Sequence, residues 1–239
     1  MPPSLLITRP APGDAEFADV ARTRLGCCVP VVLSPVLRIE GTGQPVDLQG
    51  VAALIISSRH TIRFIPACGL PLWVVGRKVA EAAQKAGLVV VHVARDSAAL
   101  LAGMKAMQPS GPFLHLRGEH VAGDIANNLG RSGIVCTEQV VYRQEAELLT
   151  TEARALLDGE QPVVLPLFSP RSCTILYDQG PFRAPVVVLA ISKTVVQVLP
   201  DAAAAVVLVA ERPDGAAMAE ALPAAVEAAK RLEGQMGAQ

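Results

Sequence analysis

The chain has 239 residues, of which 51% are hydrophobic and 18% charged, and its formal net charge is −1. This length and apolar content allow two domains of modest size with buried cores, and they exclude a largely disordered chain. The near-neutral charge and an aromatic content of only 3% argue against a surface built mainly for nucleic acid.

Cysteine usage and the start of the chain indicate a compartment. The chain has no CxxC pair and no Cys/His cluster with zinc-ligand spacing, so we expect no metal site. The N-terminus lacks a basic segment before its first apolar run, and no apolar run approaches the roughly 18 residues of a membrane helix. We therefore expect a soluble cytoplasmic protein with reduced thiols and no membrane partner. The cysteines are Cys27, Cys28, Cys68, Cys136 and Cys173, of which we interpret the adjacent first two as strand filler.

The first half of the chain alternates short apolar runs with segments of helical spacing. Residues 5–8 form the first run, and Asp14 can cap a helix that Gly26 ends. Extended segments follow at residues 29–33 and 36–39. The pattern then predicts a strand at 53–56, a short helix with Ile62 and Phe64, a strand at 72–75, a helix at 77–86, a strand at 88–92, a helix capped by Ser97, a strand at 113–116 and a helix ending at Gly130.

A strand at residues 133–143 lies near the middle of the chain. β-Branched residues are dense between Val140 and Tyr142, and similar strand–loop–helix units stand on both sides. We predict that this strand carries the chain from one lobe back to the other. The elements expected after it are a helix at 144–157, strands at 163–167, 185–190 and 206–209, and an Ala-rich helix at 216–232.

This alternation of strands and helices predicts an α/β protein with parallel sheets covered on both faces. In such sheets ligands bind beyond the carboxyl ends of the strands. The chemistry should therefore be sought in the loops after Ile7, Ile56, Val75, Leu116, Leu167 and Ala190.

These loops contain hydroxyl groups and cations that suit an anionic ligand. Serine hydroxyls and exposed N–H groups bind anions, and arginine adds bidentate contacts to carboxylates. The alternative is that each basic residue is a solvated surface charge. The candidates are Arg9, Ser57, Ser58, Arg59, Arg77, Arg117, Ser169, Arg171, Ser172, Lys193 and Thr194.

A weak internal repeat suggests that one lobe is a duplicate of the other. Ser58 follows one strand and Gly76 follows the next, and Ser169 and Ser192 stand in the same relation. Each first serine is followed closely by an arginine.

No nucleophile–base pair is evident, and the motifs GxSxG, GxGxxG, HExxH and the P-loop are absent. This absence indicates chemistry done by shape and electrostatics. Tyr142 is either an ordinary strand tyrosine or a group at a ligand site. His92 and His115 are expected to be core or rim histidines, whereas His60 lies in a loop that can touch a ligand.

Seven segments, taken in order, make the chain resemble the uroporphyrinogen-III synthase family. They are LLITRP (5–10), ISSRHTIRF (56–64), VGRKVA (75–80), HLRG (115–118), VY (141–142), FSPRS (168–172) and AISKT (190–194). The chain departs from the family pattern at three positions. Val79 stands where threonine is common, Ser192 replaces a second glycine, and Val195 falls near another position where threonine is common.

The resemblance implies two flavodoxin-like lobes joined by a two-stranded β-ladder, with the active-site cleft between them. Residues 1–34 and 143–239 would form one lobe, and residues 35–142 the other. The ladder would pair the region 31–39 with the strand at 133–143.

The resemblance also implies a reaction. Hydroxymethylbilane, a linear tetrapyrrole with acetate and propionate groups, loses its hydroxyl group, inverts its last ring and closes to uroporphyrinogen III without a cofactor. This step belongs to heme, siroheme and cobalamin biosynthesis, and we expect a monomer to perform it. The phenol of Tyr142 would assist the loss of water, and Gly76, Gly118 and Ser192 would join the candidates above in binding substrate.

Two other functions stay open. A two-lobe binding or regulatory protein that has lost the activity is the main alternative, with Val79 and Val195 in its favour. An enzyme that acts on phosphorylated sugars or nucleotides is the other, although the chain lacks a Gly-rich phosphate loop.

Overall fold

The computed structural model describes residues 2–26, 29–120 and 123–236, and it divides the chain into two compact units. Unit 1 comprises residues 1–38 and 145–239, and unit 2 comprises residues 39–144. Cys27 and Cys28, for which we predicted a strand, lie outside the described residues. None of the described helices is long and apolar enough to span a membrane.

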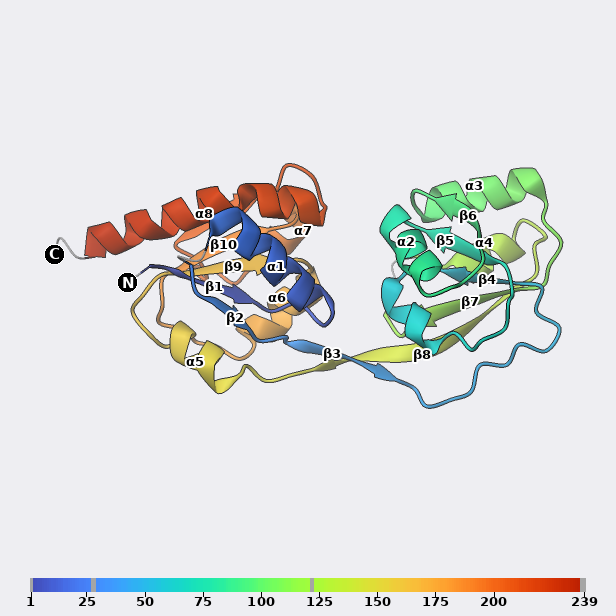
Figure 1. The fold of residues 1–239 in the computed structure, drawn as a ribbon, viewed down its shortest axis with the longest axis horizontal. Helices are drawn as coiled ribbons and strands as arrows, with labels where there is room; N and C mark the ends of the chain where they lie inside the picture. The colour runs from blue at the N-terminus through green and yellow to red at the C-terminus, as the bar shows by residue number, and fades with distance from the viewer. Residues whose placement is uncertain (1, 27–28, 121–122, 237–239) are drawn as a thin grey trace. The chain divides into compact units, whose positions relative to one another are not determined.

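Unit 1 contains a five-stranded parallel sheet in the order β11-β10-β9-β1-β2 (Figure 1). Every residue of β9 and β10 is buried, as expected for central strands of a parallel sheet covered on both faces. The strands are β1 (Ser4–Ile7), β2 (Val31–Leu33), β9 (Val163–Leu167), β10 (Val186–Ala190) and β11 (Val206–Val209).

Helices cover both faces of this sheet because successive strand residues point to opposite sides. Leu5 and Ile7 pack in one core cluster with α1 (Gly13–Leu25) and α8 (Gly215–Met236). Leu6 packs on the other face with α5 (Thr151–Leu157), α6 (Pro170–Tyr177) and α7 (Lys193–Val196). Figure 1 shows α1 and α8 on one side of the sheet and α5 on the other.

Unit 2 contains a six-stranded sheet in the order β3-β8-β7-β4-β5-β6. The pairs from β8 to β6 are parallel. The strands are β3 (Leu37–Gly41), β4 (Ala53–Ile56), β5 (Leu72–Val75), β6 (Val90–Ala94), β7 (Phe113–Gly118) and β8 (Cys136–Ala146).

Unit 2 also buries both faces of its sheet. One core cluster includes residues of α2 (Arg77–Lys85) and the 3-10 helix η1 (Arg59–Phe64). The other includes Leu100 and Met104 of α3 (Ser97–Met107) and Leu129 of α4 (Ile125–Gly130). Both clusters are formed by residues of unit 2 alone.

The strands β3 and β8 are neighbours, and the boundary between the units falls inside both of them. Thr42 N donates to Val141 O at 3.1 Å, and Glu147 N donates to Val36 O at 2.9 Å. The expected pairing of residues 31–33 with the middle strand was wrong. Those residues form β2, which pairs with β1 because its apolar side chains complete the core of unit 1.

The middle strand and the helix after it both begin later than predicted. Gly133 turns with a φ of +78°, and β8 then runs from Cys136 to Ala146. The next helix, α5, therefore begins at Thr151 and not at residue 144.

Candidate functional site

The predicted polar loops of unit 2 lie at the carboxyl ends of its parallel strands. Ser57 and Ser58 follow β4, Gly76 follows β5, and Gly118 ends β7. Because parallel strands end at the same edge of a sheet, these loops gather at one edge of unit 2.

Ser58 and Tyr142 form a hydrogen-bonded pair at this edge. The hydroxyl of Tyr142 donates to Ser58 Oγ at 3.0 Å. Ser58 is the N-cap of η1, and its Oγ also accepts from the backbone N–H of His60 at 3.2 Å. Ser58 is half-buried, whereas Tyr142 is 4% exposed. The structure thus connects two residues that are 84 positions apart in the chain.

Close packing fixes the ring of Tyr142. It stacks on Phe64 with ring centroids 5.9 Å apart and an interplanar angle of 16°, and His60 approaches its edge at 6.1 Å. A Cβ atom built on Gly118 would lie only 2.5 Å from Tyr142 Cζ. Gly118 therefore provides the space that the phenol ring occupies.

The phenol stays protonated at neutral pH. Burial raises the pKa of Tyr142 above its usual 10, and the hydrogen bond with Ser58 offsets part of this increase. Tyr142 is therefore available as a hydrogen-bond donor and not as a base.

Arg117 is held by residues of its own unit. Its guanidinium bonds Glu138 Oε1 at 2.5 Å and donates to the carbonyls of Gly118 and Glu119. The hydrogen bond to Glu138 raises the pKa of Arg117, and the same bond lowers the pKa of the Glu138 carboxyl. Arg117 therefore connects β7 to β8. Its role in substrate binding stays a prediction.

The remaining candidates of unit 2 differ in exposure. Gly76 caps α2 with a φ of +94°, a conformation that favours glycine. Arg77 is 88% exposed and lies 3.5 Å from Glu81, one helical turn away. Ser57 and Arg59 are half-buried at the end of β4 and the start of η1.

In unit 1 the corresponding edge carries Arg9 beside an aromatic pair. The Arg9 guanidinium carbon lies 4.2 Å from the centroid of Phe168, which in turn meets Phe17 edge-on at 4.8 Å. The cation–π contact places the positive charge of Arg9 against the face of the Phe168 ring at this edge.

Ser169 and Ser172 are hydrogen-bonded to each other at the start of α6. Ser169 is the N-cap, accepts from Ser172 N at 3.1 Å and donates to Ser172 Oγ at 2.9 Å. Ser172 is 4% exposed, and Arg171 beside it is half-buried. The two serine side chains thus hold the start of α6.

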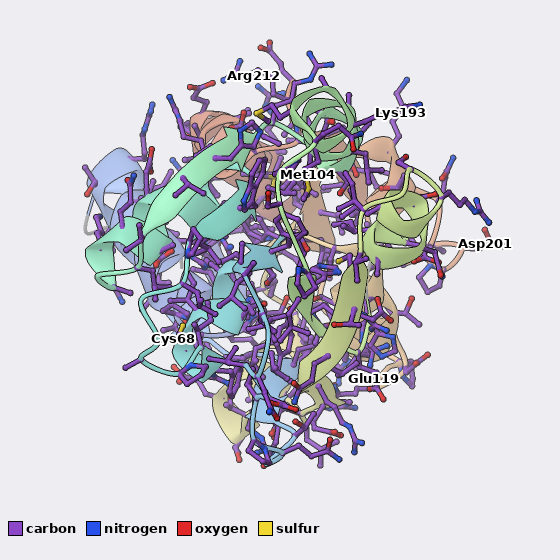
Figure 2. All side chains as sticks on the ribbon, turned by 90° about the vertical axis from the view of Figure 1, so that its right-hand side faces the viewer. Cys68, Met104, Glu119, Lys193, Asp201 and Arg212 are labelled. Atoms are coloured by element: carbon purple, nitrogen blue, oxygen red, sulfur yellow. The ribbon has the colours of Figure 1, made fainter. Side chains whose placement is uncertain are left out.

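The loop after β10 places two hydroxyl groups together. Ser192 Oγ and Thr194 Oγ1 lie 2.7 Å apart, and the Lys193 side chain, labelled in Figure 2, is exposed. Val195 is fully buried in the core of unit 1, so a hydroxyl at this position would not be exposed at the edge.

The repeat found in the sequence has a structural counterpart. Ser58 and Ser169 are both N-cap residues after a strand, and Gly76 and Ser192 are both N-cap residues after the neighbouring parallel strand.

The sequence did not single out His115 as an unusual group. His115 on β7 is 1% exposed, and neither ring nitrogen has a hydrogen-bond partner among the described residues. Burial lowers its pKa to about 4, so its imidazole is neutral. Its position in an apolar strand predicted burial, but nothing in the sequence predicted that both nitrogens would lack partners.

In the part of the chain that the structure describes, we find neither an activated cysteine thiolate nor a cluster of metal ligands. Burial raises the pKa of the Cys136 and Cys173 thiols to about 11, so both are protonated at neutral pH. Residues 2–26, 29–120 and 123–236 contain no group of three His, Cys, Asp or Glu side chains arranged to hold a metal ion. The two edges offer hydroxyl groups, N–H groups and cations, which suit carboxylates.

A family model described as uroporphyrinogen-III synthase HemD matches residues 25–220. The chain belongs to the uroporphyrinogen-III synthase family. Among curated proteins, no sequence matches significantly.

One solved structure shows the same fold, and a second is reported beside it. The uroporphyrinogen-III synthetase of Helicobacter pylori is 13% identical, with a TM-score of 0.64, over 94% of this chain and 99% of that one. A mutant uroporphyrinogen III synthase of Thermus thermophilus is 18% identical over 94% of this chain and 99% of that one, with a TM-score of 0.47. The resemblance found in the sequence motifs is confirmed for the family by the family model and for the fold by the Helicobacter pylori structure.

Proposed function

We propose that the chain is an active uroporphyrinogen-III synthase, a cyclising hydro-lyase that converts hydroxymethylbilane to uroporphyrinogen III. The observation that carries this proposal is the family match over residues 25–220. The polar edges support it, because the substrate bears acetate and propionate groups that need cations and hydroxyl donors.

In this proposal the edges bind carboxylates. The guanidinium of Arg9, the hydroxyl pair of Ser192 and Thr194, and the ammonium of Lys193 supply positive charge and hydrogen bonds in unit 1. Arg59, Arg77 and Arg171 are further candidates for the same task. Orientation matters most, because ring closure without inversion competes and the bound chain must be held in the folded form that inverts.

The loss of water needs a donor to the departing oxygen. When the C–O bond of the hydroxymethyl group breaks, the electron pair leaves with oxygen, and the pyrrole N–H of the same ring gives up the proton that completes the water molecule. A hydrogen bond to the departing oxygen stabilises the charge that develops on it. The hydroxyl pair of Tyr142 and Ser58 supplies such a donor in unit 2. No cofactor takes part in this scheme.

An isomer assay tests the proposal. Hydroxymethylbilane is generated in situ, and the products are oxidised and separated by chromatography. Active protein should give mainly isomer III, whereas a reaction without it should give isomer I. Isomer I as the only product in the presence of folded protein would contradict the proposal.

The regulatory alternative makes a different prediction in the same assay. Val79, where the family often has threonine, favours it, whereas the buried Val195 does not bear on it. A protein of that kind would bind the bilane or the product and give no isomer III.

A further inference from the structure

The Ser58 hydroxyl can form one further hydrogen bond, and only as a donor. A serine hydroxyl has one proton and two acceptor positions. Tyr142 Oη donates to the oxygen at 3.0 Å and His60 N donates to it at 3.2 Å. A phenol is more acidic than an alcohol, so Tyr142 is the donor of the pair. Both acceptor positions of Ser58 are thus filled, and its proton has no acceptor among the described residues.

The packing of Tyr142 prevents its hydroxyl from contacting a ligand directly. Its side chain is 4% exposed and lies between Phe64, which stacks on the ring, and Gly118, whose Cα leaves no room beside it. Its only hydroxyl proton is directed at Ser58. The ring would have to leave this packing before its hydroxyl could contact a ligand.

We propose that Ser58, and not Tyr142, is the hydrogen-bond donor that unit 2 presents to the ligand, and that Tyr142 is a positioning residue that acts through Ser58. This inference rests on the proposed function and specifies its site. Because Ser58 can only donate, the ligand atom must be an oxygen with a lone pair, either the departing hydroxyl or a carboxylate. An N–H group or a cation would find no acceptor at the Ser58 hydroxyl and is therefore excluded from this position.

Positioning here involves no proton transfer from Tyr142. Such a transfer would leave a phenolate in a buried position, where loss of hydration disfavours the charge. Tyr142 and the N–H of His60 instead fix the rotation of the Ser58 hydroxyl, so that its proton points to the one direction left.

The equivalent serine of unit 1 shows that this arrangement is specific to unit 2. Ser169 also caps a helix after a strand, but it donates its own proton to Ser172 Oγ at 2.9 Å. At equivalent positions of the repeat, the hydroxyl proton of Ser58 is thus left for the ligand in unit 2, whereas that of Ser169 is donated to Ser172 in unit 1.

Steady-state kinetics of the isomer III reaction tests the proposal. Ser58→Ala should lower kcat about 100-fold, as loss of one preorganised donor does. Tyr142→Phe should lower kcat about 10-fold with little change in KM, because the serine proton remains but is less well oriented. The double variant should be no worse than Ser58→Ala, since the two residues act as one unit. Ser58→Thr keeps the hydroxyl and should retain most of the activity.

Asp96→Ala is the matched structural control. Asp96 also caps a helix of unit 2, by accepting from Ala99 N at 2.7 Å, and it follows β6, two strands away from the strand β4 that precedes Ser58. It should leave kcat within about twofold. The proposal is overturned if Tyr142→Phe abolishes activity while Ser58→Ala retains it, or if the two losses multiply in the double variant.

A spectroscopic measurement separates this inference from the proposed function. The chain has two tyrosines, so a Tyr177→Phe background leaves Tyr142 as the sole source of the tyrosine Raman doublet. Ser58→Ala in this background should shift the doublet toward that of a weaker donor. An unchanged doublet would refute the pairing even in an active enzyme. A wild-type protein that forms no isomer III, but whose doublet shifts as expected, would refute the proposed function alone.

Discussion

At residue 118, the packing around one ring decides which amino acid can be tolerated. A Cβ on Gly118 would lie 2.5 Å from Tyr142 Cζ, 2.6 Å from Cε2 and 2.8 Å from the hydroxyl oxygen. We expect Gly118→Ala to displace the ring, destabilise unit 2 by about 2 kcal/mol and break the contact with Ser58. Urea unfolding followed by fluorescence of Trp73, the single tryptophan, measures the loss.

Gly130→Ala is the control for this substitution. No atom lies within 4 Å of a Cβ at Gly130, which ends α4. Its free energy of unfolding should change by less than about 0.5 kcal/mol. Equal losses in the two variants would show that the contact with Tyr142 has no energetic effect.

His115 should make the stability of unit 2 depend on pH. Burial lowers its pKa from 6.5 to about 4, with the charges of Glu138, Arg117 and Asp124 as smaller influences. Above pH 6.5 the imidazole is neutral in both states, so its contribution is fully present. Between pH 6.5 and 4 only the unfolded chain binds the proton, and the free energy of unfolding should fall by about 3 kcal/mol.

The variant His115→Leu isolates this effect from the carboxylates that titrate in the same range. Urea midpoints at pH 7.5, 6, 5 and 4.5, read by Trp73 fluorescence, should fall less steeply in the variant than in the wild type. Parallel slopes for the two proteins would contradict a neutral buried His115.

Residue identity predicted in which loops the polar groups lie, but not which of their hydrogen-bond donors already have an acceptor within the protein. Ser58 and Ser169 are both serines after an apolar strand, so the local pattern predicts the same role for both. Their hydrogen bonds differ because Ser172 lies beside Ser169 in α6, whereas Tyr142 reaches Ser58 from a strand far along the chain. Contacts between distant segments of this kind leave no local pattern.

Among the elements, the edge strand β6 exposes a row of apolar side chains. Val91 and Val93 of β6 are 53% and 45% exposed, Val89 just before the strand is 52% exposed, and β6 is the last strand of its sheet. An apolar edge strand without charge is a template for pairing with other chains. Val91→Thr should reduce light scattering during refolding at high protein concentration and leave the urea midpoint nearly unchanged.

Val74→Thr provides the contrast. Val74 lies on β5, inside the same sheet, and is fully buried. Its buried hydroxyl should destabilise unit 2 by about 1–3 kcal/mol. If Val91→Thr destabilised the protein as strongly, the edge would be packed rather than exposed.

The sequence predicted helices and strands correctly where a buried apolar run forms the element. The predicted boundaries were wrong where strand pairing outweighs the helix propensity of the residues. Residues 144–147 favour a helix in isolation, yet β8 continues to Ala146 and Glu147 N bonds Val36 O. The helix α6 was missed entirely. Its signal was present, because Ser169 at the N-cap and Pro170 at the first helical position are typical of a helix start.

On the scale of the whole molecule, unit 2 should fold without the rest of the chain. Its two core clusters consist only of residues between 39 and 144. We expect a fragment of residues 37–146, which keeps β3 and β8 whole, to unfold cooperatively in urea. Trp73, at 8% exposure, reports the transition. A fragment that shows no sigmoidal change in fluorescence would refute this independence.

The discontinuous unit 1 has a consequence for synthesis on the ribosome. Its strand β1 pairs with β2, close in the chain, and with β9, which begins only at Val163. All of unit 2 is translated between them. The earlier of the two segments of unit 1 must therefore wait, with Leu5 and Ile7 uncovered, while unit 2, which is made next, completes its sheet. Rare codons or a pause between residues 145 and 167 would prolong that exposure, and a trigger-type chaperone that binds apolar nascent segments would find its target within the first 33 residues.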